Sequence, residues 1–350
     1  VILGDFVTTE DGTGVVHTAP TFGADDFRVA QQNGIPAILV QDENGKDMPL
    51  VDKRGRFVKE VTDFALEYVK EAYLTDEEKE EERQKQGRDK YLSVDERIAI
   101  KLKTENKAFN VQRFEHPYPH CWRCHTALIY YAQPSWYIRT TAIKDALVRE
   151  NEGTTWFPET IKHGRYGDWL DNNIDWALSR KRYWGTPLPI WRCADDHQIC
   201  VGSRAQLSEL TGRDLSDLDP HRPFVDDVTF DCPTCGAEAR RVPEVIDAWF
   251  DSGSMPFAQW GYPWVEGSVE KLESAYPADF ICEAIDQTRG WFYTLMAVGT
   301  LVFDQNSYRN VLCLGHILAE DGRKMSKHLG NILEPIPLMD EHGADAVRWF

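Results

Sequence analysis

A short basic loop late in the chain gathers side chains that can bind a polyanion. Residues 322–331 have the sequence GRKMSKHLGN, with two lysines, an arginine and a histidine between glycines. The chain as a whole is acidic, with 57 Asp and Glu, 39 Lys and Arg, and a net charge of −18. A local cluster of ammonium groups in such a chain favours phosphate, which lysine binds as a point charge. The loop follows the apolar run 310–318, and loops after parallel strands bind ligands in open α/β sheets.

The eight cysteines include two close pairs with the spacing of metal ligands. Cys232 and Cys235 flank Pro-Thr in a zinc-knuckle-like turn, and Cys193 lies upstream with His197 or Cys200 as a further candidate. Three thiolates and one imidazole would complete a tetrahedral structural zinc site. We prefer His197 as the fourth ligand, because the run 199–201 predicts a buried strand, and Cys200 stays the alternative.

Cys121 and Cys124 form a second half-site, for which no further cysteine pair remains in the chain. Disulfides are typical of secreted proteins, and no secretory signal is present. We therefore interpret both pairs as metal ligands and expect a cytoplasmic protein. No apolar run approaches the roughly 18 residues of a membrane span, so we expect no membrane association.

Residues 1–110 are predicted to form the first of two domains. Short apolar runs broken by Gly, Asp and Pro predict strands at 35–41 and 55–61. Apolar residues at helical spacing predict a helix over 61–72, and the charged run 76–90 predicts a solvated helix or linker. Ser93 and Glu96 form the pattern of a capping box, which predicts the start of another helix.

Residues 111–350 are predicted to form the second domain. The region after residue 111 is rich in aromatic residues, proline and arginine, and a small cysteine-bearing insert interrupts the domain at about 193–241. The runs 278–285, 288–303 and 310–318 then alternate strand, helix and strand. This alternation is typical of an α/β fold with a parallel sheet.

The order Lys324, Met325, Ser326, Lys327 resembles the KMSKS signature of class I aminoacyl-tRNA synthetases, with His328 in place of the last serine. The stretches 179–187, 247–253 and 286–292 resemble the isoleucine, valine and leucine subgroup. The resemblance to isoleucyl-tRNA synthetases covers essentially the whole chain. It implies the carboxyl half of a Rossmann-type catalytic domain with a zinc-bearing insert, preceded by part of a β-rich editing (CP1) domain.

The resemblance also implies an activity and its partners. An isoleucine–tRNA ligase activates isoleucine with ATP and Mg²⁺, transfers it to tRNA(Ile), and carries Zn²⁺. Lys324 and Lys327 would stabilise charge on the phosphoryl group during activation. The implied adenylate site further comprises Ser326 on ATP, Gly315 and His316 under the nucleotide, Trp249 and Trp291 as walls of an apolar pocket, and Glu283, Asp286 and Gln287 on the ribose and the substrate ammonium. In the family, the partner cysteines of Cys121 and Cys124 lie upstream.

His17, Thr18 and Asp26 resemble residues of the editing domain that hydrolyses mischarged valine. By that resemblance, Asp26 would hold the free ammonium and His17 would contact the terminal ribose or the side chain. If residues 25–27 are extended, Asp25 should point away from this pocket. Editing has a physical reason, because one methylene changes binding by only about 1–3 kcal/mol, a limit for which isoleucyl-tRNA synthetase is the well-known example.

The family's second ATP signature, HIGH, does not occur in the chain, which begins with VILGDFVTTE rather than Met. We therefore expect an internal fragment of a monomeric parent enzyme, inactive alone. Two alternatives stay open. One is a valyl-tRNA synthetase, and the other is a catalytically inactive zinc-bearing module that binds RNA.

Overall fold

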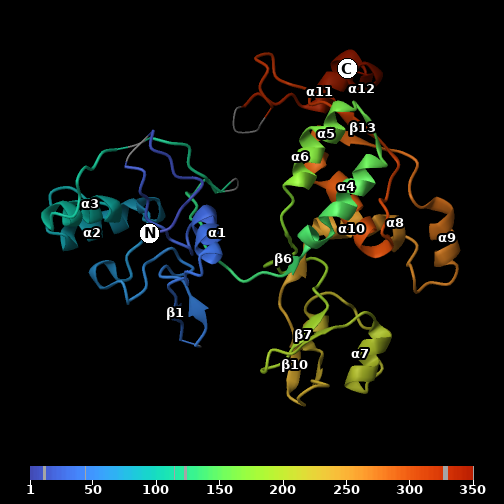
Figure 1. Cartoon of the computed structure of the whole chain (residues 1–350), viewed down its shortest axis with the longest axis horizontal. Coiled ribbons are helices and arrows are strands. Elements are labelled where there is room, and N and C mark those ends of the chain that lie inside the picture. The colour runs from blue at the N-terminus through green and yellow to red at the C-terminus, as the bar shows by residue number, and fades with distance from the viewer. Residues whose placement is uncertain (11–12, 44, 114, 122–123, 326–329, 350) are drawn as a thin grey trace. The chain divides into compact units, whose positions relative to one another are not determined.

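The computed structural model describes residues 1–350 except 11–12, 44, 114, 122–123, 326–329 and 350. It divides into two compact units, Val1–Pro134 and Ser135–Phe350, each of which is described by itself (Figure 1). Among the described residues, no helix is long and apolar enough to cross a membrane.

The division between the units falls later than the boundary expected near residue 110. The Tyr73 hydroxyl donates a hydrogen bond to the Ala127 carbonyl oxygen at 2.8 Å. The Ala132 N–H donates to the Thr21 carbonyl oxygen at 3.0 Å. These two contacts hold the segment 111–134 to the first unit.

The first unit is built from short elements. They are α1 (Ala24–Gln32), β1 (Val40–Gln41), β2 (Asp47–Met48), the 3₁₀ helices η1 (Thr62–Phe64) and η2 (Glu71–Tyr73), α2 (Asp76–Lys85) and α3 (Val94–Thr104). Strands β1 and β2 pair antiparallel, so only the end of the strand predicted at 35–41 is formed. The strand predicted at 55–61 is replaced by the single bridges Val51–Phe57 and Arg56–Tyr68.

The helix predicted over 61–72 is wrong. Leu66 has a φ of 64°, a left-handed conformation that ends a right-handed helix. The backbone there pairs with an earlier segment instead, since the Phe57 N–H donates to the Glu67 oxygen and the Val69 N–H to the Gly55 oxygen, both at 2.9 Å. The segment with helical apolar spacing is therefore a loop whose backbone pairs with residues 55–57.

The two charged helices of this unit begin at capping boxes. Thr75 and Glu78 cap α2. This helix covers much of the charged run 76–90, for which either a solvated helix or a linker was expected, and it confirms the helix. Ser93 and Glu96 cap α3, as predicted. Each box satisfies N–H groups that the first helical turn leaves without an intrahelical partner.

The second unit contains the predicted parallel sheet. Its strand order is β12 (Ile281–Ala284), β13 (Asn310–Leu314), β4 (Thr155–Phe157), and all pairings are parallel. Helix α10 (Trp291–Phe303) connects β12 to β13, which confirms the strand–helix–strand prediction. The carboxyl ends of all three strands consequently lie at the same edge of the sheet.

Helix α10 forms the centre of the core. It packs against α8 (Ala248–Ala258) and α4 (Lys144–Glu152), and Figure 1 shows it beside both. Residues 292–300 of α10 are all buried. Gly253 permits the close approach of α8, because a Cβ there would lie 2.7 Å from the Thr294 carbonyl oxygen.

The remaining elements of the second unit lie outside the insert or build it. Outside the insert they are β3 (Tyr137–Ile138), η3 (Thr140–Ile143), α5 (Thr160–His163), α6 (Arg165–Asp171), β5 (Trp176–Ala177), β6 (Ser179–Arg180), β11 (Val245–Ile246), α9 (Ser268–Ala275), η5 (Ile285–Arg289), α11 (Pro335–His342) and α12 (Ala344–Trp349). The insert contains β7 (Ile190–Arg192), β8 (Gln198–Cys200), α7 (Arg204–Thr211), η4 (Phe224–Asp227), β9 (Thr229–Asp231) and β10 (Glu238–Arg241).

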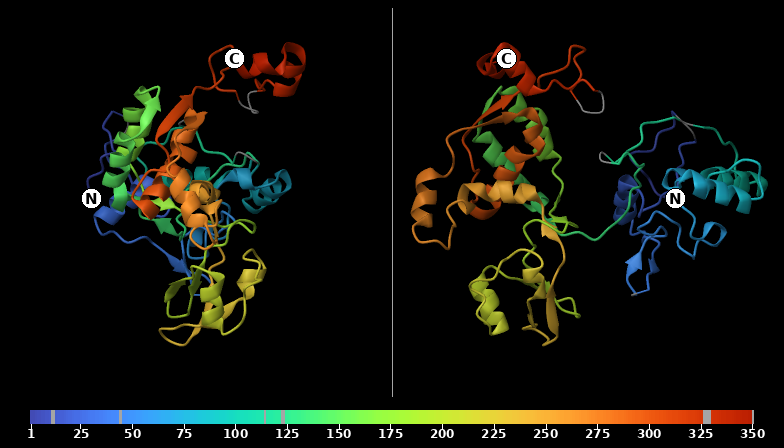
Figure 2. Two further views of the ribbon diagram at one scale, coloured as in Figure 1. Left: turned by 90° about the vertical axis from the view of Figure 1, so that its right-hand side faces the viewer. Right: turned by 180° about the vertical axis from the view of Figure 1, so that it is seen from behind.

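The insert has an antiparallel sheet and a hydrophobic core of its own. Its strand order is β8-β7-β10-β9. Trp191 and Phe230 are buried at its centre. In Figure 1 and in both views of Figure 2, these strands and α7 gather in a separate lobe. The antiparallel pair β6–β11 carries the chain out to this lobe and back.

Candidate functional site: a metal centre and a substrate edge

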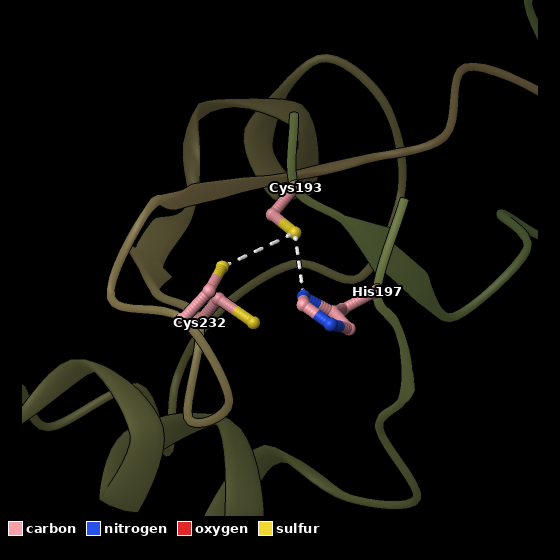
Figure 3. A group of neighbouring side chains, drawn as sticks. Cys193, His197 and Cys232 are labelled. Carbon is pink, nitrogen blue, oxygen red and sulfur yellow. Dashed lines mark hydrogen bonds between the residues drawn. The ribbon is translucent and has the colours of Figure 1, made fainter. Parts of the chain in front are cut away.

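Two hairpin turns of the insert bring four potential metal ligands together. Cys193 and His197 lie in the turn between β7 and β8, and Cys232 and Cys235 lie in the turn between β9 and β10. Their ligand atoms all lie within 4.8 Å of one another. Figure 3 shows the side chains of Cys193, His197 and Cys232 directed toward a common centre. The structure thus assembles the four residues that the sequence grouped.

The spacing of these atoms fits a tetrahedral zinc ion. The Cys193 sulfur lies 3.4 Å from His197 Nδ1 and 3.7 Å from the Cys235 sulfur. Zinc bonds are about 2.3 Å to sulfur and about 2.0–2.1 Å to nitrogen. In a tetrahedral site these bonds place sulfur about 3.6 Å from nitrogen and about 3.8 Å from another sulfur. The donor set and its spacing therefore match a structural zinc site.

Backbone N–H groups prepare one of these thiols for a cation. Burial opposes ionisation of Cys232, but the N–H groups of Cys235 and Thr234, together with the thiols of Cys235 and Cys193, outweigh it and lower the pKa of this thiol to about 7. The neighbouring thiols raise the pKa of Cys235 in return, so the first proton leaves Cys232. The thiolate is the form that binds metals.

Cys200 stands outside this cluster. It lies on β8, so the strand predicted for 199–201 is present in part, but its side chain is exposed rather than buried. Among the described residues, the cluster of metal-type ligands includes His197 and not Cys200.

Cys121 and Cys124 lie in a turn of the first unit. The Cys121 N–H donates to the Thr126 carbonyl oxygen at 2.9 Å, and the Cys124 thiol donates to the Thr126 hydroxyl at 3.4 Å. A cavity of about 490 Å³ opens beside them. Within the described part of the chain, no third metal-type ligand joins this pair.

The expected adenylate residues lie at the carboxyl edge of the parallel sheet. Glu283 is on β12, and Asp286 and Gln287 follow on η5. Gly315 and His316 follow β13 directly and are exposed. Because β12 and β13 are parallel neighbours, these groups share one edge of the sheet.

Gln287 connects this edge to the start of α10. Its Oε1 accepts a hydrogen bond from the Trp291 N–H at 2.8 Å, and its Nε2 donates to Asp286 Oδ2 at 3.2 Å. The amide therefore orients the neighbouring carboxylate while it caps a free N–H of the helix. The other carboxylate oxygen of Asp286, Oδ1, is available to a ligand donor.

The two tryptophans expected as pocket walls begin adjacent helices. Trp249 lies in the first turn of α8 and is 43% exposed, and Trp291 is the first residue of α10. The Trp291 indole N–H donates to the Ser252 carbonyl oxygen at 3.3 Å. A Cβ on Gly290 would lie 3.4 Å from Trp249 Cη2. The Trp249 indole thus reaches the start of α10, and the Trp291 indole reaches the backbone of α8.

A buried carboxylate beneath Trp249 was not singled out by the sequence. Asp247 is 6% exposed, and its Oδ2 accepts from Arg180 Nη2 at 2.6 Å and from the Trp176 indole at 3.2 Å. Its Oδ1 accepts from the Trp249 N–H at 3.3 Å. Arg180 and Asp247 belong to two of the stretches that carry the resemblance, but a contact between residues 67 positions apart has no local signal.

Helix α6 also supports this edge through residues that the sequence did not indicate. Arg165 Nε donates to the hydroxyl of Thr288 at 2.9 Å, and Thr288 donates in turn to the Ile285 carbonyl oxygen at 2.7 Å. The Arg289 guanidinium lies over the Trp169 ring, 5.0 Å from its centroid. These contacts fix the carboxyl end of η5 to α6.

Only part of the basic loop is described. Lys324 is exposed and forms a backbone bridge with Leu318. Gly322 has a φ of 77° in the turn between them. The guanidinium of Arg323 lowers the pKa of Asp321, to which it is paired. The expected ATP contacts Ser326 and Lys327 lie outside the described residues.

The expected editing residues lie around the start of α1. Asp26 Oδ2 accepts from the Ala19 N–H at 3.1 Å, which ties the helix to the segment carrying His17 and Thr18. His17 is exposed and Thr18 is half-buried. Residues 25–27 are helical rather than extended, because they occupy the first turn of α1.

Asp25 nevertheless has a different partner from Asp26. Asp25 Oδ1 accepts from Arg28 Nη2 at 3.3 Å, one turn further along α1. The separation of the two carboxylates expected from an extended segment is thus produced by the helix, on which adjacent residues point about 100° apart.

Comparison with known proteins places the chain in a family. Residues 58–350 match the family described as tRNA synthetases class I (I, L, M and V). The isoleucine–tRNA ligase of Streptomyces coelicolor is 62% identical over 355 residues, which covers 100% of this chain and 30% of that enzyme. The isoleucine–tRNA ligase of Cytophaga hutchinsonii is 55% identical over 361 residues, covering 100% of this chain and 32% of that enzyme.

Solved structures give a weaker match. A LeuRS–tRNA–LeuAMS ternary complex from Agrobacterium radiobacter K84 aligns with 54% of this chain and 26% of its own, at 23% identity and a TM-score of 0.38. A structural similarity this low adds nothing to the family match. The chain spans about 30% of the length of the isoleucine–tRNA ligases that it matches. The chain belongs to the class I tRNA synthetases (I, L, M and V), and over its whole length it is similar to isoleucine–tRNA ligases.

Proposed function

We propose that this chain is a segment of an isoleucine–tRNA ligase, an enzyme that activates isoleucine with ATP and transfers it to tRNA(Ile). The observation that carries the proposal is the approach of the Trp249 indole to the start of α10, beside Gln287 and Asp286 at the carboxyl edge of a parallel sheet, in a chain of this family. Indole rings beside a carboxylate and an amide suit an amino acid with an aliphatic side chain.

Each group at this edge has a role in the proposed reaction. The two indoles pack against the isoleucine side chain and exclude water from it. Asp286 accepts hydrogen bonds from the substrate ammonium. Glu283, the last residue but one of β12, binds the ribose. Lys324 and Lys327 stabilise the charge that develops as the carboxylate attacks the α-phosphate of ATP. Catalysis in this scheme consists of positioning and electrostatic stabilisation.

The proposed zinc ion has a structural role. Cys193, His197, Cys232 and Cys235 would supply all four ligands of a tetrahedral ion, which would leave no position open for a substrate. The ion would join the two hairpin turns at the edge of the insert's hydrophobic core. We assign no metal of this kind to Cys121 and Cys124 within the chain.

The first unit is proposed to contribute to editing. Asp26 offers a carboxylate to the free ammonium of a mischarged valine, and His17 and Thr18 lie on the segment hydrogen-bonded to it. A charge-assisted contact of this type distinguishes an aminoacyl ester from uncharged tRNA.

The test is ATP–pyrophosphate exchange by the full-length ligase that contains this chain. We expect exchange that depends on isoleucine and that strongly exceeds exchange with valine. Lys327→Ala should lower the rate of adenylate formation by about a hundredfold while isoleucine binding stays near normal, because this contact strengthens in the transition state. Lys59→Ala, at an exposed position of the first unit, is the matched control and should leave the exchange rate unchanged.

Three outcomes would overturn the proposal. A preference for valine would identify a valyl-tRNA synthetase. Binding of tRNA without exchange for any amino acid would identify an RNA-binding module. Normal adenylate formation by Lys327→Ala would remove the basic loop from the reaction.

A further inference from the structure

We propose that Asp247, held by Arg180, is a positioning residue that sets the place of Trp249 and thereby the selection of isoleucine over valine. The inference rests on the proposed function and extends it to residues outside the pocket. It starts from a buried charge that the proposed reaction does not use.

Asp247 is the only acidic side chain among the described residues that is buried. Burial of a carboxylate is costly unless donors surround it. Three donors converge on Asp247: the Arg180 guanidinium at 2.6 Å, the Trp176 indole at 3.2 Å and the Trp249 backbone N–H at 3.3 Å. The charge is therefore compensated, and its removal would leave several donors without an acceptor.

One of the donors belongs to the pocket wall itself. Asp247 is the N-cap of α8, and its Oδ1 fixes the backbone of Trp249 in the first turn. Trp291 is linked to the same helix one turn later, because its indole donates to the Ser252 carbonyl oxygen at 3.3 Å. The Asp247 carboxylate thus fixes the first turn of α8, whose Trp249 indole reaches the start of α10.

The position of that turn matters for selectivity. Isoleucine and valine differ by one methylene, which contributes about 1–3 kcal/mol only where the pocket walls contact it closely. A gap of about 0.5–1 Å forfeits a quarter to a half of a van der Waals contact. A wall that is no longer held by its N-cap therefore loses discrimination before it loses affinity for aliphatic side chains in general.

The substitution Asp247→Asn keeps the size of the side chain and changes only its donors and acceptors. Its single amide oxygen cannot replace both carboxylate oxygens. If it accepts from the Arg180 guanidinium and the Trp176 indole, the amide NH₂ faces the Trp249 N–H and the cap is lost. In the other orientation the NH₂ faces the guanidinium and the indole, which are donors too. Arg180→Met produces the opposite defect, since it leaves the buried carboxylate without its cation. Arg180→Lys keeps the charge but loses the planar guanidinium group.

The experiment measures kcat/KM for isoleucine and for valine in ATP–pyrophosphate exchange by the full-length ligase. We expect Asp247→Asn to lower the ratio of the two values by about fivefold to tenfold. Arg180→Met should do the same, and Arg180→Lys should recover part of the ratio. The matched control is Asp226→Asn in the insert, where a carboxylate also accepts from two arginines, Arg222 and Arg241, both at 2.6 Å.

Asp226→Asn should leave the ratio unchanged. A ratio that Asp247→Asn does not change, or that Asp226→Asn lowers equally, would overturn the inference. A uniform loss of kcat/KM for both amino acids would also overturn it, because that result indicates only a structural role.

A second measurement tests the positioning separately from the reaction. Hydrogen exchange of the amides 248–252 in this chain should be faster in Asp247→Asn than in the unsubstituted chain or in Asp226→Asn. If exchange at these amides is unchanged, Asp247 does not hold the turn. If isoleucine-dependent activity is absent from the unsubstituted ligase while these amides respond as expected, the proposed function fails and the positioning role stands.

Discussion

Replacing Cys232 by serine should remove the zinc ion and unfold the insert. A serine hydroxyl is a poor substitute for a thiolate, so three ligands would remain of the four that lie within 4.8 Å. Structural zinc contributes about 10–16 kcal/mol of apparent binding free energy. A core as small as that of the insert rarely supplies more than about 3–5 kcal/mol. We therefore expect the metal to decide whether the insert folds.

The assay is elemental analysis of the purified chain combined with limited proteolysis. We expect about one zinc per unsubstituted chain and well under about a tenth as much in Cys232→Ser. Protease cleavage should then increase at residues 193–241. The control is Cys200→Ser, since this cysteine is exposed on β8 close to the cluster but outside it.

Three results would contradict the proposed zinc ligands. Zinc retained by Cys232→Ser would refute the site, and zinc lost from Cys200→Ser would show that the fourth ligand is not His197. A content of two zinc ions per chain would show that Cys121 and Cys124 find further ligands. The same content in Cys121→Ser and in the unsubstituted chain is the expected result.

Three other substitutions test separate parts of the chain. Asp26→Ala in the full-length ligase should lower deacylation of Val-tRNA about tenfold or more, since one charge-assisted hydrogen bond is worth roughly 1.5–3 kcal/mol, and an unchanged rate would exclude Asp26 from editing. Gly253→Ala should lower the free energy of unfolding by about 1–3 kcal/mol, because its Cβ would lie 2.7 Å from the Thr294 oxygen, whereas Gly153→Ala, with 3.6 Å to its nearest atom, should cost much less in the same urea titration. Burial raises the pKa of Tyr308, so this side chain binds its proton more tightly in the folded state, and the free energy of unfolding should fall as the pH rises above about 10, where the unfolded tyrosine ionises. Tyr308→Phe should flatten that fall by up to about 1.4 kcal/mol per pH unit, and equal slopes in urea unfolding would contradict this reasoning.

The parts of the fold that the sequence predicted are those whose signals are local. The run 288–303 is long and apolar, and it lies between two short apolar segments, so α10 and its flanking strands follow from composition and length. The metal ligands are predictable for the same reason, because each hairpin turn contributes two ligands that are close in sequence. The capping boxes of α2 and α3 are also complete within four residues.

The features that the sequence did not predict depend on long-range contacts. The helical spacing over 61–72 was misleading, because Phe57 and Gly55 pair with that segment and Leu66 adopts a left-handed conformation. A period of 3.6 residues in a short apolar segment also fits a loop that buries one side. The contact between Arg180 and Asp247 joins positions 67 residues apart, with the whole insert between them.

The same long-range contact holds the junction between the insert and the unit that carries the parallel sheet. The insert leaves and rejoins this unit through β6 and β11, whose register pairs Val245 with Arg180 and Ile246 with Ser179. The ion pair between Arg180 and Asp247 closes this junction on the side of Trp249, and the Asp247 N–H donates to the Leu178 oxygen at 2.8 Å. None of these contacts involves a metal ligand. We therefore expect a zinc ion to affect the folding of the insert, while the junction holds Trp249 through contacts that need no metal.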